Sequence, residues 1–164
     1  CERLKNGKSF YTALHSEKHE PDNPTYTPRI SGIIQPLDGA MTLSIISKSD
    51  LKPTATIISS GSEVAIAVDV QQKLAEDNIG INVVSMPSWE IFDNQELDYQ
   101  QSILGSGLRV GLEAAIEQGW HKYLGEGGIF IGMKGFGSSA PAEQLYDHFN
   151  INVQSVIEEI KGNL

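Results

Sequence analysis

Cysteine, basic residues and long apolar runs are all scarce in this sequence of 164 residues. The one cysteine, Cys1, excludes a disulfide within the chain and a structural zinc site that needs several thiolates. The 12 Lys and Arg residues are outnumbered by 21 Asp and Glu residues, so the formal net charge is −9. Nucleic acids and anionic membrane surfaces bind clustered basic residues, so we expect no nucleic-acid and no membrane partner.

No apolar run approaches the roughly 20 residues that a helix needs to cross a bilayer. The first residues, CERLKNGKSF, contain no signal-peptide apolar segment, and we therefore expect a cytoplasmic location. The sequence does not begin with Met, and CERLKNGK is typical of the end of an amphipathic helix. These features predict a piece of a longer polypeptide.

Residues 19–38 differ in composition from the rest, because they contain four of the seven prolines. Proline lacks a backbone donor and disfavours a helical conformation in the preceding residue, so this stretch is interpreted as a linker. We predict two parts: 1–37, the tail of a preceding domain with its linker, and 38–164, a compact domain.

From Ala40 onward, apolar segments alternate with segments of helical periodicity. The predicted strands are 41–47, 54–59, 81–86, 107–114 and 127–133. The predicted helices are 63–77, 93–103, one near Ile116, 141–149 and 152–161. This order indicates an α/β domain whose mostly parallel sheet is covered on both faces. The first strand, joined to the second by a short connection, is expected at an edge and antiparallel.

The turn Ser59-Ser60-Gly61-Ser62-Glu63 lies between a predicted strand and a predicted helix. Unpaired N–H groups and the helix dipole favour anions at such a turn, so Ser60, Gly61 and Ser62 are candidate anion-binding residues. However, Glu63 already supplies a carboxylate, and Ser62 can cap the helix. The P-loop and dinucleotide-binding patterns are absent. We favour a structural cap over a ligand site.

The four histidines are weak candidates for metal ligands or catalytic bases. His15 and His19 are four residues apart, but Pro21 argues against the continuous helix on which they would share a metal, and a solvated segment is favoured. His121 and His148 lie among aromatic residues and are interpreted as packing or surface residues. Either would serve as a general base only if a carboxylate oriented it in a cleft.

A second glycine-rich loop, with Gly132, Gly135 and Gly137, precedes the helix that begins near Pro141. Its position allows anion binding or simple capping at the helix end, and we again favour the cap. No Ser, Cys or Lys lies in a recognised nucleophile pattern. The residues alone therefore indicate an acidic α/β domain without a complete active site.

Three stretches have a more specific pattern. They are IISSGSEVAIAVDVQQKL, INVVSMPSWEIFDNQELDYQQSIL, and the segment from EAAIEQGW to VIEEI. Together they resemble the C-terminal domain of transketolase, from about Asp38 to Leu164. The most diagnostic elements are VSMPSWE-x-FD, residues 84–93, and FG-x-SAPAE, residues 136–143.

This resemblance implies a three-layer α/β/α sandwich with about five strands, the first antiparallel. It also implies a parent homodimer of the pentose phosphate pathway that transfers a two-carbon ketol unit from a ketose phosphate to an aldose phosphate. In that family, thiamine diphosphate and a divalent metal, Mg²⁺ or Ca²⁺, are bound between the two preceding domains. The resemblance thus implies no catalytic, cofactor-binding or metal residue in this chain, and the missing N-terminal domains and a second subunit as partners.

Two features depart from the family pattern. Residues 12–18 are similar to the family segment that ends in a phosphate-binding arginine, but Glu17 lies roughly where that arginine is expected. Either the alignment is shifted and Lys18 or Arg29 takes that role, or the parent differs from the family at this position. Gly125-Glu126-Gly127, followed by Asn150, is similar to the G-D-G…N magnesium motif of thiamine-diphosphate enzymes, but the acid is Glu and we interpret the match as coincidental.

Two alternatives stay open. The first is a regulatory or anion-binding α/β module that uses the 59–63 turn. The second is the tail domain of a related thiamine-diphosphate enzyme. The reading frame upstream of Cys1 would separate them from transketolase.

Overall fold

The computed structural model describes residues 35–37, 40–42, 45–47 and 49–164, and side chains from residue 49 onward. The predictions for His15, His19, Glu17, Lys18 and Arg29 lie outside the described residues. The elements are β1 (Gln35–Leu37), β2 (Ala40–Thr42), β3 (Ile45–Ser47), β4 (Pro53–Ser59), α3 (Glu63–Glu76), β5 (Gly80–Ser85), α4 (Trp89–Asp93), α5 (Leu97–Leu104), β6 (Leu108–Leu112), α6 (His121–Leu124), β7 (Ile129–Ile131), α7 (Ala142–His148) and α8 (Val153–Asn163).

The main sheet has the strand order β3-β5-β4-β6-β7. Ile57 at the middle of β4 lies opposite Val83 of β5 and Val110 of β6, and both pairings are parallel. Four strands of this sheet are parallel; the expectation was a sheet of about five strands with the first one antiparallel. The additional edge strand β3 has only three residues and pairs antiparallel with β5, with Ile46 opposite Val84.

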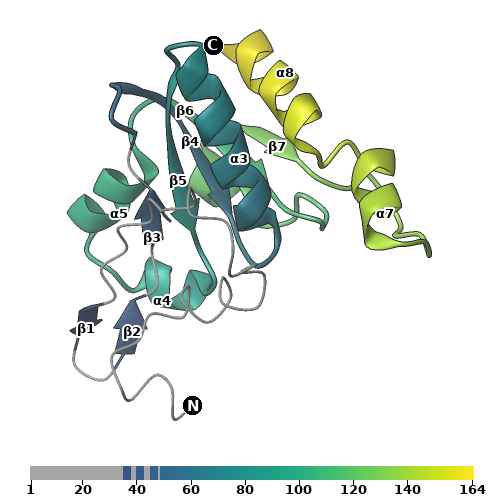
Figure 1. Ribbon diagram of the computed structural model, residues 1–164. Coiled ribbons are helices and arrows are strands. Elements are labelled where there is room, and N and C mark those ends of the chain that lie inside the picture. Colours follow the sequence, from purple (N-terminus) through teal and green to yellow (C-terminus); the bar gives the residue numbers. More distant parts are fainter. Residues whose placement is uncertain (1–34, 38–39, 43–44, 48) are drawn as a thin grey trace, which may run out of the picture.

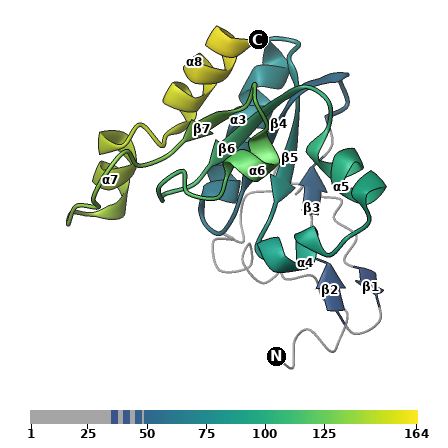
Figure 2. The same cartoon turned by 180° about the vertical axis from the view of Figure 1, so that it is seen from behind.

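Helices cover both faces of this sheet, as predicted (Figures 1 and 2). One face packs against α3 and α8 through a cluster that includes Ile57, Val70 and Ile160. The opposite face packs against α4, α5 and α6 through a cluster that includes Ile58 and Phe92. The domain is therefore a three-layer α/β/α sandwich.

The adjacent apolar residues Ile57 and Ile58 of β4 reflect this double coverage. Both are 0% exposed, yet they belong to the clusters on opposite faces. Successive side chains of a strand point to opposite faces, so a strand with two covered faces can bury neighbouring apolar residues.

The structure differs most from the predicted elements at residues 41–47, at residues 93–103 and near Ile116. Residues 41–47 are two strands: β2 pairs with β1 in a separate two-stranded sheet, and only β3 joins the main sheet. The predicted helix 93–103 begins later, as α5 at Leu97, and a separate short helix, α4, precedes it. The Asn94 side chain donates to the Glu90 carbonyl at 2.8 Å at the end of α4.

The predicted helix near Ile116 is wrong. Residues 113–120 contain no helix: 114–115 form a bend and 118–120 a turn, and the short helix α6 begins at His121. Gly119 has φ +88°, a left-handed conformation that interrupts a helix. The predicted boundary between 37 and 38 stays a prediction.

Gly111 of β6 is at a close approach between the sheet and α6. A Cβ atom there would lie 2.8 Å from Cδ2 of Phe130 and 3.1 Å from Cε3 of Trp120. Because these rings are packed in the core, we expect Gly111→Ala to lower the free energy of unfolding by about 1–3 kcal/mol. Urea denaturation measures this change.

Gly127→Ala is the matched control, since a Cβ at Gly127 meets nothing within 4 Å. It should change the free energy of unfolding by no more than about 0.5 kcal/mol. Equal stability of the two variants would contradict the packing argument.

Candidate functional site

The candidate site lies where the chain order of the parallel strands reverses. From β4 the chain continues through α3 to β5 on one side, and from β5 it crosses to β6 on the other side of β4. In open α/β sheets, ligands bind at the carboxyl ends of the strands beside such a switch point. Ser60 and Glu113 directly follow β4 and β6 at this crevice.

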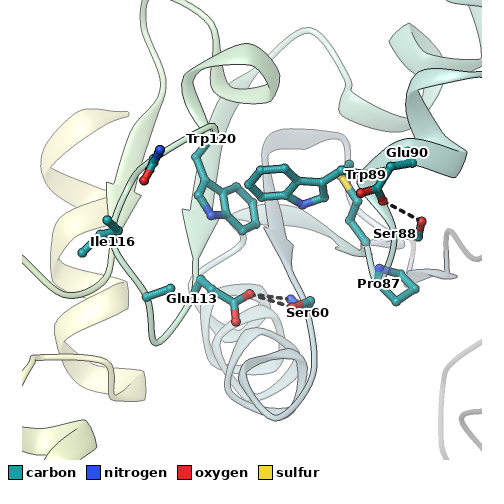
Figure 3. Close-up of a pocket in the computed structure, with 11 residues that line it drawn as sticks. Ser60, Pro87, Ser88, Trp89, Glu90, Glu113, Ile116 and Trp120 are labelled. Atoms are coloured by element: carbon teal, nitrogen blue, oxygen red, sulfur yellow. Dashed lines mark hydrogen bonds between the residues drawn. The ribbon is translucent and has the colours of Figure 1, made fainter. Parts of the chain in front are cut away.

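The Glu113 carboxylate occupies the crevice (Figure 3). Its Oε2 accepts one hydrogen bond from the Ser60 backbone N–H at 3.2 Å and another from the Ser60 hydroxyl at 2.8 Å. The Ser60 N–H and hydroxyl, the two groups of Ser60 that could donate to a bound anion, thus donate to the Glu113 carboxylate instead. This geometry weighs against the hypothesis of an anion site at Ser60, Gly61 and Ser62, which stays a prediction.

A second carboxylate lies in the first turn of α3. Glu63 is only 3% exposed, and its Oε1 accepts hydrogen bonds from the Tyr146 hydroxyl at 2.7 Å and the Ser62 hydroxyl at 3.2 Å. The Ser62 and Tyr146 hydroxyls are 3.0 Å apart. Tyr146 belongs to α7, so this network joins the ends of two helices that are distant in sequence.

The prediction that the Ser62 side chain caps α3 is wrong. Ser62 is at the N-cap position, but its side chain makes no capping hydrogen bond. Its φ of −70° and ψ of −29° are helical, whereas a capping residue is usually extended. The Oγ atom is therefore directed to Glu63 and Tyr146 instead of the N–H groups of the next turn.

The two carboxylates influence each other electrostatically. Burial, the largest effect, raises the pKa of Glu113, and the negative charge of Glu63 raises it further, although the hydrogen bonds from Ser60 oppose both. The pKa of Tyr146 is raised mainly by burial, with a contribution from its hydrogen bond to Glu63. Negative charge is thus concentrated at this end of the sheet.

A pocket of about 450 Å³ opens beside Glu113. Trp89 and Trp120 form its aromatic wall, with ring centroids 5.4 Å apart and planes at 83° (Figure 3). The remaining lining residues are Ser60, Met86, Pro87, Ser88, Glu90, Glu113, Ala115, Ile116 and Gln118. The pocket therefore combines indole rings, two carboxylates and small polar groups.

The sequence analysis did not select Glu113, Tyr146, Trp89 or Trp120 as site residues. Glu113 had a usable signal, because a carboxylate directly after a buried strand lies at the edge where ligands bind. Tyr146 had no such signal, because its hydrogen bond to Glu63 joins residues that are 83 positions apart in the sequence.

The other candidates are surface residues. His121 and His148 are exposed, as the surface interpretation predicted, and the His148 ring packs edge-on against Phe149 at 4.8 Å. The residues of Gly125-Glu126-Gly127 and Asn150 are exposed as well. Pro141 precedes α7 without a side-chain cap.

Within the described ranges, no group of three or more His, Cys, Asp or Glu side chains is arranged to hold a metal ion. In the same part of the chain, no helix has the length and apolar character needed to cross a membrane.

The fold and the crevice define a doubly wound α/β domain whose switch point is occupied by its own carboxylates. The family model described as the transketolase-like TK C-terminal domain matches residues 43–152. The chain therefore belongs to the transketolase-like C-terminal domain family.

Individual relatives agree with this assignment. The chain is 49% identical to a transketolase of Sinorhizobium medicae over 105 residues, which cover 63% of this chain and 15% of that protein. It is 45% identical to a transketolase of Cereibacter sphaeroides over 109 residues, which cover 66% of this chain and 17% of that protein. The solved transketolase of Leishmania mexicana superposes with a TM-score of 0.65 at 37% identity, over 71% of this chain and 17% of that one.

The raised pKa of Glu113 predicts a pH dependence of stability. A raised folded-state pKa means that the protonated form stabilises the fold; this contribution is present below the ordinary value of 4.5 and is lost as pH rises through the folded value. We expect Glu113→Gln to remove it, so the variant should gain stability relative to the parent chain as pH rises above 4.5. Urea denaturation of both proteins, at a series of pH values from below 4.5 upward, measures the difference in their free energies of unfolding. A difference that does not change with pH would contradict the prediction.

The Tyr146 hydroxyl should contribute to stability through Glu63. Tyr146→Phe leaves a buried carboxylate with one hydroxyl donor fewer, so we expect a loss of about 1–3 kcal/mol in the free energy of unfolding. Thermal and urea denaturation measure this loss. Tyr99→Phe, which removes a hydroxyl from another partly buried ring, is the control, and an equal effect of both substitutions would refute a specific role.

Proposed function

We propose that this chain is the C-terminal, non-catalytic domain of a transketolase. The parent homodimer would transfer a two-carbon ketol unit from a ketose phosphate to an aldose phosphate with thiamine diphosphate and Mg²⁺ or Ca²⁺, in the cytoplasm. The observation that carries this proposal is the 49% identity to a protein named transketolase, of which the chain spans only 15%. Most of such a parent would thus consist of other segments.

The described residues do not fit thiamine diphosphate. A diphosphate needs free N–H donors or basic groups together with a metal. At the switch point, both Ser60 donors are bound to Glu113, and the buried Glu63 adds negative charge. We therefore propose that no residue of this chain contacts the cofactor, which when bound elsewhere in the parent supplies the carbanion chemistry of ketol transfer.

An exposed loop supports a packing role in the parent. Residues 134–144 are all exposed, and Phe136 is 101% exposed. Helix α7, which follows, has no buried residue and lies at the margin of the domain in both ribbon views. Burial of the Phe136 ring against another surface would be favourable, because apolar area would be removed from water. We propose that this loop faces the N-terminal domains or the second subunit.

The two alternatives are less well supported. A phosphate module at the 59–63 turn is disfavoured by the carboxylates of Glu63 and Glu113, which repel anions. The tail of a different thiamine-diphosphate enzyme is less consistent with relatives that are named transketolase at 45–49% identity.

We expect the 164-residue chain to have no ketol-transfer activity and to bind no thiamine diphosphate, because the groups required lie in other parts of the parent. Calorimetric titration with thiamine diphosphate and Mg²⁺, followed by a turnover assay with xylulose 5-phosphate and ribose 5-phosphate, measures both. The complete Sinorhizobium medicae relative, assayed in parallel, is the positive control. Saturable cofactor binding or turnover by the chain alone would overturn the proposal.

A further inference from the structure

The pocket beside Glu113 has the size and composition of a small-molecule site. Its volume of about 450 Å³ is within the range of ligand-binding clefts. Two of its lining residues are glutamates, Glu90 and Glu113, and none is Lys, Arg or His. Such a lining attracts positive charge and repels phosphate or carboxylate ligands.

The negative charge at this position has no cationic partner in the described part of the chain. The salt bridges there join Lys122 to Asp93 and Lys161 to Asp77, away from Glu63 and Glu113. Buried carboxylates are usually paired, because removal of an ion from water is costly. A cation placed against Glu113 would reduce its repulsion with Glu63.

The aromatic wall is suited to the same kind of ligand. The face of an indole ring attracts cations through its quadrupole, and tryptophan is the best residue for this interaction. Trp89 is half-buried and is therefore the ring that a ligand can reach, whereas Trp120 is 2% exposed and supports it from behind. Trp89 packs edge-on against both Trp120 and Tyr123. The rings are thus fixed before a ligand arrives, so binding would cost little side-chain entropy.

The Glu113 carboxylate is fixed as well. Its two hydrogen bonds come from Ser60, at 3.2 and 2.8 Å, so its orientation at the base of the pocket does not depend on a ligand (Figure 3). A fixed carboxylate beside indole faces matches a guanidinium group, which is planar, donates hydrogen bonds and stacks on aromatic rings.

We propose that this pocket binds a small organic cation, a guanidinium group on a short apolar stem. The guanidinium lies against Glu113 and the half-buried Trp89, with Glu90 at the rim. The stem contacts the exposed apolar lining residue Ile116. The site uses groups of this chain alone, and it does not depend on the activity of the parent.

Titration of the 164-residue chain with n-butylguanidinium tests the proposal, with n-butylurea as a neutral ligand of the same shape. The sequence contains two tryptophans, and both line the pocket, so intrinsic fluorescence reports on this site. We expect a saturable change with n-butylguanidinium and at least about tenfold weaker binding of n-butylurea, because the charge-assisted hydrogen bonds and the cation–π contact are lost. Calorimetry gives the affinities independently.

Glu113→Gln keeps an acceptor for Ser60 and removes the charge, so it should weaken n-butylguanidinium binding by about tenfold. Glu126→Gln is the matched control: it makes the same change of net charge at an exposed residue outside the pocket and should leave binding unchanged. If Glu113→Gln does not fold, as judged by circular dichroism, the exposed Glu90→Gln takes its place, with an expected loss of about threefold.

Three results would overturn the proposal: equal affinity for n-butylguanidinium and n-butylurea, equal affinity of the Glu113→Gln and Glu126→Gln variants, or no saturable signal with n-butylguanidinium. Saturable binding of inorganic phosphate at the same tryptophans would also overturn it, since that result would place an anion where we place a cation.

Discussion

The burial of β4 on both faces is the constraint on which the rest of the structure depends. Residues 55–59 are all buried, with Ile57 and Ile58 in the hydrophobic clusters of opposite faces. A strand of this kind needs a layer of helices on each face and a hydrogen-bonded neighbour at each edge. The chain meets this need by placing β5 on one side of β4 and β6 on the other. The crossing connection creates the switch point, so the site is a direct consequence of how the core is covered.

What occupies that crevice distinguishes this domain from other doubly wound folds. A phosphate-binding turn leaves its N–H groups free for the ligand. Here the Ser60 N–H and hydroxyl are bound to Glu113, while Glu63 is held by Tyr146. The carboxylates take the positions of an anionic ligand and connect β4 to β6 and α3 to α7. The chemistry that this end of the sheet can support is consequently that of a negatively charged, aromatic-walled pocket.

The sequence predicted the layers well and the site poorly, for the same physical reason. The apolar periodicity of β4 and α3 reports which residues face the core, so the α/β order, the covered sheet and the parallel strands could be predicted. Glu113 and Tyr146 act through pairings across 53 and 84 positions with Ser60 and Ser62, and no local pattern encodes such distances. Ser62 shows the limit of local rules: its residue type predicts a cap, but a helical backbone directs its hydroxyl elsewhere.

The residues that carry the family resemblance are not mainly those that build the core. In the 84–93 stretch, Val84, Ser85, Met86 and Phe92 are buried, whereas Pro87, Ser88, Trp89 and Glu90 are partly or fully exposed and line the pocket. The second diagnostic stretch, 136–143, is exposed throughout. Core positions accept any apolar side chain of suitable volume, so they identify a fold class and little more. Surface residues have no such general reason to be Trp, Glu or Phe. Packing within the described part of the chain does not explain the identities of the exposed residues among them, and these residues lie at the pocket and in the 134–144 loop.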